Sequence, residues 1–118
     1  PNDYNSFQHA LRVNGMRAWW LAPPHHLNYF TFDSLSALVT RAGFREIART
    51  TSFPMEMFAL MGDIYMDDDE LGRTCHMRRV SFDLALARSE GGAARRAFYS
   101  ALAAAGQGRE AIIIAAKA

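Results

Sequence analysis

The chain has 118 residues, of which half are hydrophobic and 21% are charged, and its formal net charge is +1. This length supports one domain and excludes two, and the near-neutral balance argues against a dedicated nucleic-acid binder, which would carry a clustered basic face. A single cysteine, Cys75, excludes an intrachain disulfide framework and favours a reducing, cytoplasmic location. No apolar run reaches the length of a membrane span, so we expect no membrane partner.

The first predicted element is a short helix. Asn5 and Gln8 have the spacing of a capping box, and Gly15 supplies a stop signal. Residues 16–21 are short and apolar, which fits an extended segment.

Residues 19–30, Trp-Trp-Leu-Ala-Pro-Pro-His-His-Leu-Asn-Tyr-Phe, are the most unusual stretch. The two prolines predict a stiff, non-helical rod, with polar residues following at its end. A rigid loop that presents polar side chains among aromatic rings suits a binding or catalytic site. The alternative is a proline-bridged crossover whose rings only cover the core, and the residue types leave both interpretations open.

The clearest helix is predicted to follow this loop. Thr31 is placed to cap it, and Asp33 lies in the first turn, where the helix dipole favours an anion. Phe30 and Leu35 have the spacing of a hydrophobic staple, and Gly43 ends the helix.

The middle of the chain alternates between extended and helical patterns. Residues 44–53 favour a strand, and residues 55–61 a short helix after a proline. A long helix is predicted for residues 69–88. We interpret the acidic run at residues 67–70 as the capped start of that helix rather than as a divalent-metal site, because no second cluster of oxygen ligands accompanies it.

The last predicted elements are an alanine-rich helix at residues 93–105 and a strand at residues 111–116. The strand is a continuous apolar run, which is typical of a strand buried on both faces. Such a strand normally has neighbours on both edges, yet only residues 44–53 offer another good strand. We therefore expect either a second copy paired through the edge of residues 111–116, giving a homodimer, or a chain that is a piece of something larger.

One motif resembles a known family. The sequence His-Leu-Asn-Tyr-Phe-Thr-Phe-Asp-Ser-Leu at residues 26–35, followed by Ala-Gly-Phe at residues 42–44 and preceded by Pro-Asn-Asp at residues 1–3, is similar to the C-terminal part of class I S-adenosylmethionine-dependent methyltransferases. Many of those enzymes carry a segment of the form His-(Leu/Ile)-x-(Tyr/Phe)-Phe-(Ser/Thr)-x-x-Ser-Leu, followed by a helix that ends in Gly-Phe. The resemblance covers most of the chain, and residues 54–105 are its least diagnostic part.

The resemblance implies a fragment of a seven-stranded, Rossmann-like α/β fold, in which the last strand is antiparallel and lies between the fifth and the sixth. Residues 44–53 would correspond to the sixth strand and residues 111–116 to the seventh, with residues 1–3 just past the fifth. On its own, the chain is then expected to be α+β, mostly helical with a short antiparallel β-pair. Residues 1–118 would form a single substrate-side domain.

The cofactor half of that fold is missing from the sequence. The family binds its cofactor with a glycine-rich loop between a strand and a helix, and no segment here has that order. We therefore expect S-adenosylmethionine to serve the parent enzyme but not to bind these 118 residues alone.

The resemblance also suggests roles in methyl transfer to a small-molecule acceptor. His26 is the candidate base, because imidazole titrates near neutral pH. Its alternative role is to lock the loop by bonding to the backbone. The alternative for the whole chain is a non-catalytic ligand-binding or protein-interaction module. The residues proposed to bind the acceptor by stacking or hydrogen bonding are Trp19, Trp20, His25, Asn28 and Tyr29.

Overall fold

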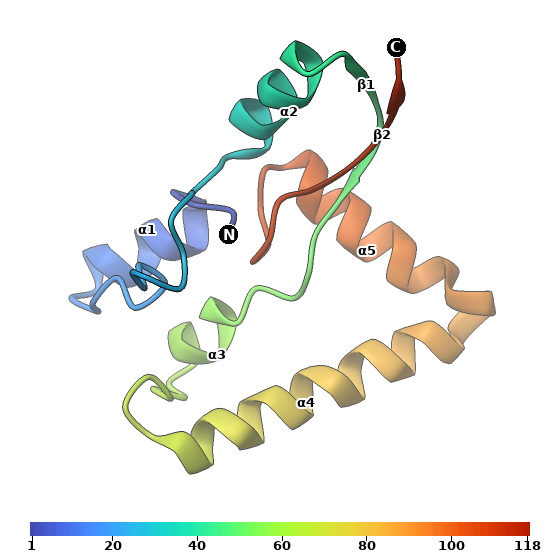
Figure 1. The fold of residues 1–118 in the computed structure, drawn as a ribbon. Coiled ribbons are helices and arrows are strands. Elements are labelled where there is room, and N and C mark those ends of the chain that lie inside the picture. The colour runs from blue at the N-terminus through green and yellow to red at the C-terminus, as the bar shows by residue number, and fades with distance from the viewer.

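The protein is an α+β structure, seen in a computed structural model that describes residues 1–118. Two strands are combined with helices that mostly precede or separate them (Figure 1). The elements in chain order are α1 (Ser6–Val13), α2 (Phe32–Arg41), β1 (Phe44–Thr50), α3 (Glu56–Leu60), α4 (Asp69–Arg88), the 3-10 helix η1 (Ser89–Gly92), α5 (Ala93–Ala104) and β2 (Ile112–Lys117).

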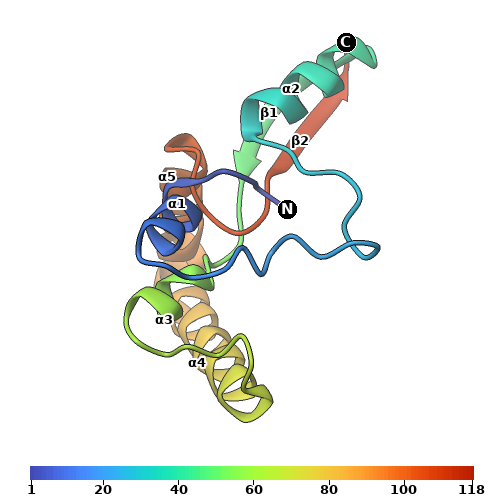
Figure 2. The same ribbon diagram turned by 90° about the vertical axis from the view of Figure 1, so that its left-hand side faces the viewer.

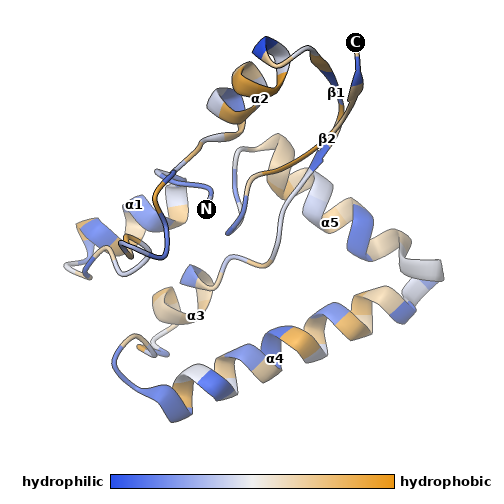
Figure 3. Cartoon of the chain, in the orientation of Figure 1, coloured by the Kyte–Doolittle hydropathy of each residue, from blue (hydrophilic) through white to orange (hydrophobic).

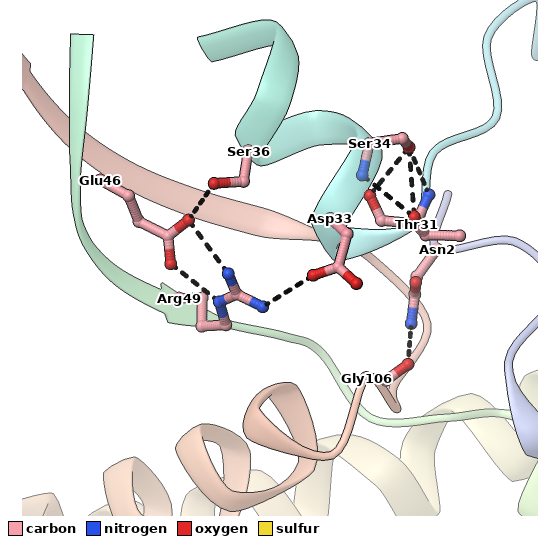
Figure 4. Close-up of polar contacts among 8 residues, drawn as sticks. All are labelled: Asn2, Thr31, Asp33, Ser34, Ser36, Glu46, Arg49 and Gly106. Atoms are coloured by element: carbon pink, nitrogen blue, oxygen red, sulfur yellow. Dashed lines mark hydrogen bonds and ion pairs between the residues drawn. The ribbon is translucent and has the colours of Figure 1, made fainter. Parts of the chain in front are cut away.

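The helices begin where local capping chemistry predicts. The Asn5 side chain accepts the Gln8 N–H at 3.0 Å, which confirms the capping box of α1. Thr31 caps α2 as expected, and Ser34 completes a second capping box by accepting the Thr31 N–H at 2.9 Å (Figure 4). Asp68 accepts a backbone N–H from the first turn of α4, which confirms that the acidic run caps this helix.

Two predicted extended segments are shorter than expected or absent. The first strand ends at Thr50 rather than at residue 53, because Thr51 turns to donate its hydroxyl to the Glu110 carbonyl at 2.7 Å and Phe53 enters the core. Residues 16–21 form no strand: residues 16–18 have no regular structure and residues 19–20 form a turn, with the Leu21 N–H donating to the Ala18 carbonyl at 3.2 Å.

The sheet is the expected antiparallel pair. Phe44 lies opposite Lys117 and Thr50 opposite Ile112, with a bulge between Glu46 and Ala48 in β1. The sheet has only these two strands, so the second edge of β2 is unpaired.

Burial of β2 on both faces was a wrong prediction for this chain. Helix α2 covers one face of the sheet, where Ser36 donates to Glu46 at 2.6 Å (Figure 4). Away from α2, the side chains of Ile47, Ile112 and Ile114 are 57%, 38% and 52% exposed. The physical reason is that α5 packs only near the Thr50 end of β1, and no other helix covers the remainder of the sheet face opposite α2.

The core lies mainly between α3, α4 and α5. It is built from Phe53, Met55, Phe58, Cys75 and Tyr99, and the hydropathy colouring of Figure 3 shows apolar residues recurring along α4 toward it. Only 19 of 118 residues are buried, so this core is small. The radius of gyration is 15.4 Å, compared with about 13.5 Å for a compact domain of this length, so the arrangement is open. No helix combines the length and the apolar composition that a membrane crossing needs.

Candidate functional site

The proline–histidine loop, residues 14–31, joins α1 to α2 and extends away from α4 and α5 (Figure 2). The C-terminal end of the loop, at Phe30, is held by the first residues of the chain. The Asp3 N–H donates to the Phe30 carbonyl at 2.9 Å, and the Phe30 N–H donates to the Pro1 carbonyl at 3.3 Å. Residues 1–3 therefore run parallel to the end of the loop and fix where it enters α2.

A buried asparagine ties this start to the turn before β2. The Asn2 side-chain amide donates to the carbonyls of Gly106 and Gly108, each at 3.0 Å, and its backbone N–H donates to the Arg109 carbonyl at 2.9 Å (Figure 4). Asn5 reinforces the link by donating to the Asn2 carbonyl at 2.9 Å. The sequence predicted a capping role for Asn5 but no role for the side chain of Asn2, because Gly106 and Gly108 lie more than a hundred residues away.

The two tryptophans lie at the base of the loop. Trp20 is 7% exposed, and its indole N–H donates to the Asp3 carboxylate at 2.9 Å. Trp19 packs edge-on against Tyr65, with ring centroids 5.4 Å apart, and the Arg109 guanidinium lies 5.7 Å from the Trp19 ring centroid. Trp20 helps to line a hollow of about 670 Å³ beside α1.

The structure brings His26 and Tyr29 together. The Tyr29 hydroxyl accepts the Ala22 N–H at 3.0 Å and donates to the His26 carbonyl at 3.2 Å, and the two rings meet edge to face. The Nδ1 atom of His26 lies 3.4 Å from the Trp20 carbonyl oxygen. A carbonyl can only accept, so this contact places the proton of a neutral imidazole on Nδ1 and leaves Nε2 free to accept one.

This geometry serves both roles that the sequence suggested for His26. A free Nε2 is what a general base requires, and the Nδ1 contact is also what would lock the loop. His25 and Asn28 are exposed. The hollow beside α1 is not lined by His25, His26 or Asn28, and neither are the hollows along α4 and α5.

The predicted stiff rod at the prolines is replaced by a turn. The His26 N–H donates to the Ala22 carbonyl at 3.0 Å, and the peptide bond between Pro23 and Pro24 is cis. His25 and His26 therefore lie on a turn, close to the tryptophans that precede it, rather than at the end of an extended arm.

Sequence reasoning missed a buried acid beneath the loop. Glu56 is 1% exposed, and its Oε2 atom has no hydrogen-bond partner, as is also true of the Tyr65 hydroxyl and the Trp19 indole N–H. Burial raises the pKa of Glu56, and the nearby Arg109 and Gln8 oppose this only in part. Burial also raises the pKa of Tyr65, with the negative charge of Glu56 adding to the effect. A glutamate in the first turn of a short helix gives no local signal of burial.

No family model, curated protein or solved structure matches this chain.

Proposed function

We propose that these 118 residues form the acceptor side of an S-adenosylmethionine-dependent methyltransferase, in which the cofactor is held by parts of the fold that they do not supply. The observation that carries the proposal is the antiparallel β1–β2 pair with an unpaired edge on β2. In the family that the loop motif resembles, the last strand is antiparallel and takes a neighbour on each edge. The free edge of β2 is where the missing neighbour would lie.

The uncovered face of the sheet supports the same proposal. Ile47 and Ile114 are more than half exposed, although isoleucines in a strand are usually buried. The small core and the large radius of gyration fit a substrate-side region that packs against more protein.

The residues present do not fit the cofactor itself. No glycine-rich turn lies between a strand and a helix, because β1 is followed by residues 51–55 without a glycine. When bound by the parent enzyme, S-adenosylmethionine would supply an activated methyl group. The part of this chain in the reaction is to position the acceptor and to take up its proton.

His26 is the residue to which we assign the proton. Its Nε2 atom would accept the proton of the acceptor's nucleophilic group as that group attacks, and the Nδ1 contact with the Trp20 carbonyl keeps the ring in the required tautomer. Tyr29 acts as a positioning residue, since its hydroxyl holds the His26 carbonyl. His25 and Asn28 are exposed beside them and would orient the acceptor by hydrogen bonds.

The first experiment extends the polypeptide toward its amino terminus to the start of its reading frame and measures S-adenosylmethionine binding by calorimetry. We expect micromolar binding by the extended polypeptide and none by the 118 residues alone. Absence of binding by the extended polypeptide would refute the assignment to methyltransferases. Micromolar binding by the 118 residues would refute the division between cofactor and acceptor sides.

The second experiment replaces His26 by Ala in the extended polypeptide. Release of S-adenosylhomocysteine is followed against a panel of phenols, amines and carboxylic acids. A catalytic base predicts unchanged cofactor binding and a loss of turnover of about 10² to 10⁴ that is smaller at high pH, where the acceptor ionises without help. Unchanged turnover would make His26 a structural residue.

A second candidate function is a non-catalytic ligand-binding or interaction module built on the same loop. One observation favours it: the Tyr29 hydroxyl and the Trp20 indole are already satisfied inside the protein, so these two polar groups need no acceptor. Cofactor binding by the extended polypeptide separates the two functions, because a module has no use for a methyl donor.

The unpaired edge of β2 also leads us to propose self-association. A second copy could add its own β2 to this edge through backbone hydrogen bonds. This pairing would compete with the missing strand of the parent enzyme, so it is expected of the 118 residues alone.

A further inference from the structure

A basic groove lies between α4 and α5. The two helices form a V that closes at η1 (Figure 1), and a hollow of about 540 Å³ runs from this vertex to residues 50–52 at the end of β1. A smaller hollow of about 270 Å³ adjoins it, and the two share Ser52 and Arg79 in their walls.

The charge of the groove is positive. Arg79, Arg95 and Arg96 line the larger hollow, and Arg109 lines the smaller one. Neither Arg95 nor Arg96 takes part in an ion pair, although Arg96 donates to the Gly91 carbonyl at 3.1 Å.

The carboxylate that lines the larger hollow, Asp83, is already hydrogen-bonded on both oxygens. One oxygen of Asp83 accepts from Arg79 at 3.3 Å, and the other accepts from the Tyr99 hydroxyl. Asp83 therefore compensates Arg79, and the charges of Arg95 and Arg96 have no counter-charge in the larger hollow. The other acid of the groove, Glu110, lines the smaller hollow together with Arg109.

An uncharged hydrogen-bond donor in the walls of the groove also lacks a partner. The Ser52 hydroxyl is buried without a hydrogen-bond partner, at the point where the two hollows meet. A buried hydroxyl without a hydrogen-bond partner is costly, so the binding of a group that accepts a hydrogen bond from it would be favoured. At the vertex, Gly92 precedes α5 and no side chain caps this helix, although the Ala93 N–H already donates to the Glu90 carbonyl.

We propose that this groove binds the phosphate group of a small molecule. Phosphate offers acceptor oxygens in several directions, which suits guanidinium groups and a hydroxyl that converge from α4, α5 and the end of β1. A carboxylate presents two coplanar oxygens and would use fewer of these donors. The proposal does not depend on methyl transfer, since none of these residues belongs to the proline–histidine loop.

The test titrates the 118-residue chain with inorganic phosphate and with pyrophosphate at constant ionic strength, and follows backbone amide shifts by NMR. We expect saturable shifts, centred on Ser52 and on the first turn of α5, at millimolar concentrations. Arg95→Ala should weaken binding about tenfold, because it removes a charged donor without any internal partner. Ser52→Ala should weaken it less.

Arg45→Ala is the matched control, since Arg45 is an exposed arginine of β1 that does not line the groove. It should leave the affinity unchanged. Phosphate also stabilises proteins by being excluded from their surface, but that effect does not saturate and is the same for both arginine variants. Shifts that do not saturate, or an equal loss of affinity in Arg45→Ala and Arg95→Ala, would overturn the proposal. Acetate binding as tight as phosphate would overturn the choice of ligand.

Discussion

The side chain of Asn2 is predicted to hold the start of the chain against the turn before β2. Replacing Asn2 by Ala removes two hydrogen bonds of 3.0 Å to the carbonyls of Gly106 and Gly108. Asn2 is 1% exposed, so water does not readily replace the lost donor. At about 1 kcal/mol for each bond, with a further cost for carbonyls left unpaired, the free energy of unfolding should fall by about 2 to 3 kcal/mol.

Urea unfolding, followed by circular dichroism, measures this loss as a lower midpoint with an unchanged slope. Asn2→Asp sharpens the test because it keeps the shape of the side chain but turns an oxygen toward both carbonyls. At neutral pH it should cost at least about 1 kcal/mol more than Asn2→Ala. Part of this should return as the pH falls toward about 3.9, because the disfavoured carboxylate takes up a proton in the folded state before the unfolded one does and can then donate.

The control is Asn28→Ala, an exposed asparagine of the loop, which should change the free energy of unfolding by no more than about 0.5 kcal/mol. A loss in Asn2→Ala as small as in this control would refute the reasoning. So would an Asn2→Asp variant as stable as Asn2→Ala at neutral pH.

Three further predictions concern stability and assembly. Gly108→Ala would place a Cβ against the buried Thr51 hydroxyl oxygen, at a residue with positive φ, and should lower the free energy of unfolding by about 3 kcal/mol or more in a thermal melt. Gly43→Ala also has a positive φ but open space around it, so it should cost only about 1 kcal/mol. Equal losses in the two variants would contradict a steric clash with Thr51. Glu56 holds its proton more tightly when folded, so the wild type should lose stability relative to Glu56→Gln as the pH rises above the ordinary carboxyl pKa of about 4.3. A stability difference that does not change with pH would count against a raised pKa. Sedimentation at high concentration should show a wild-type dimer that Ile114→Lys abolishes, and a strictly monomeric wild type would exclude pairing through β2.

The sequence by itself determined where the helices begin and which segments pair as strands. Asn5, Thr31 and Asp68 cap their helices with side chains that reach only three residues along the chain, so their signals are local. The contact between His26 and Tyr29 is equally local, since they are three residues apart, but the sequence did not predict it.

Only the tertiary structure decided which polar groups are buried and which apolar ones are not. The partners of Asn2 lie more than a hundred residues away, and Glu56 is buried because α3 packs against α1 and the tryptophans. The isoleucines of β2 indicated a strand covered on both faces, but α2 covers one face only, and the exposure of the other depends on what packs there. Burial is a property of assembled surfaces, and a run of residues cannot specify whether its covering layer is present.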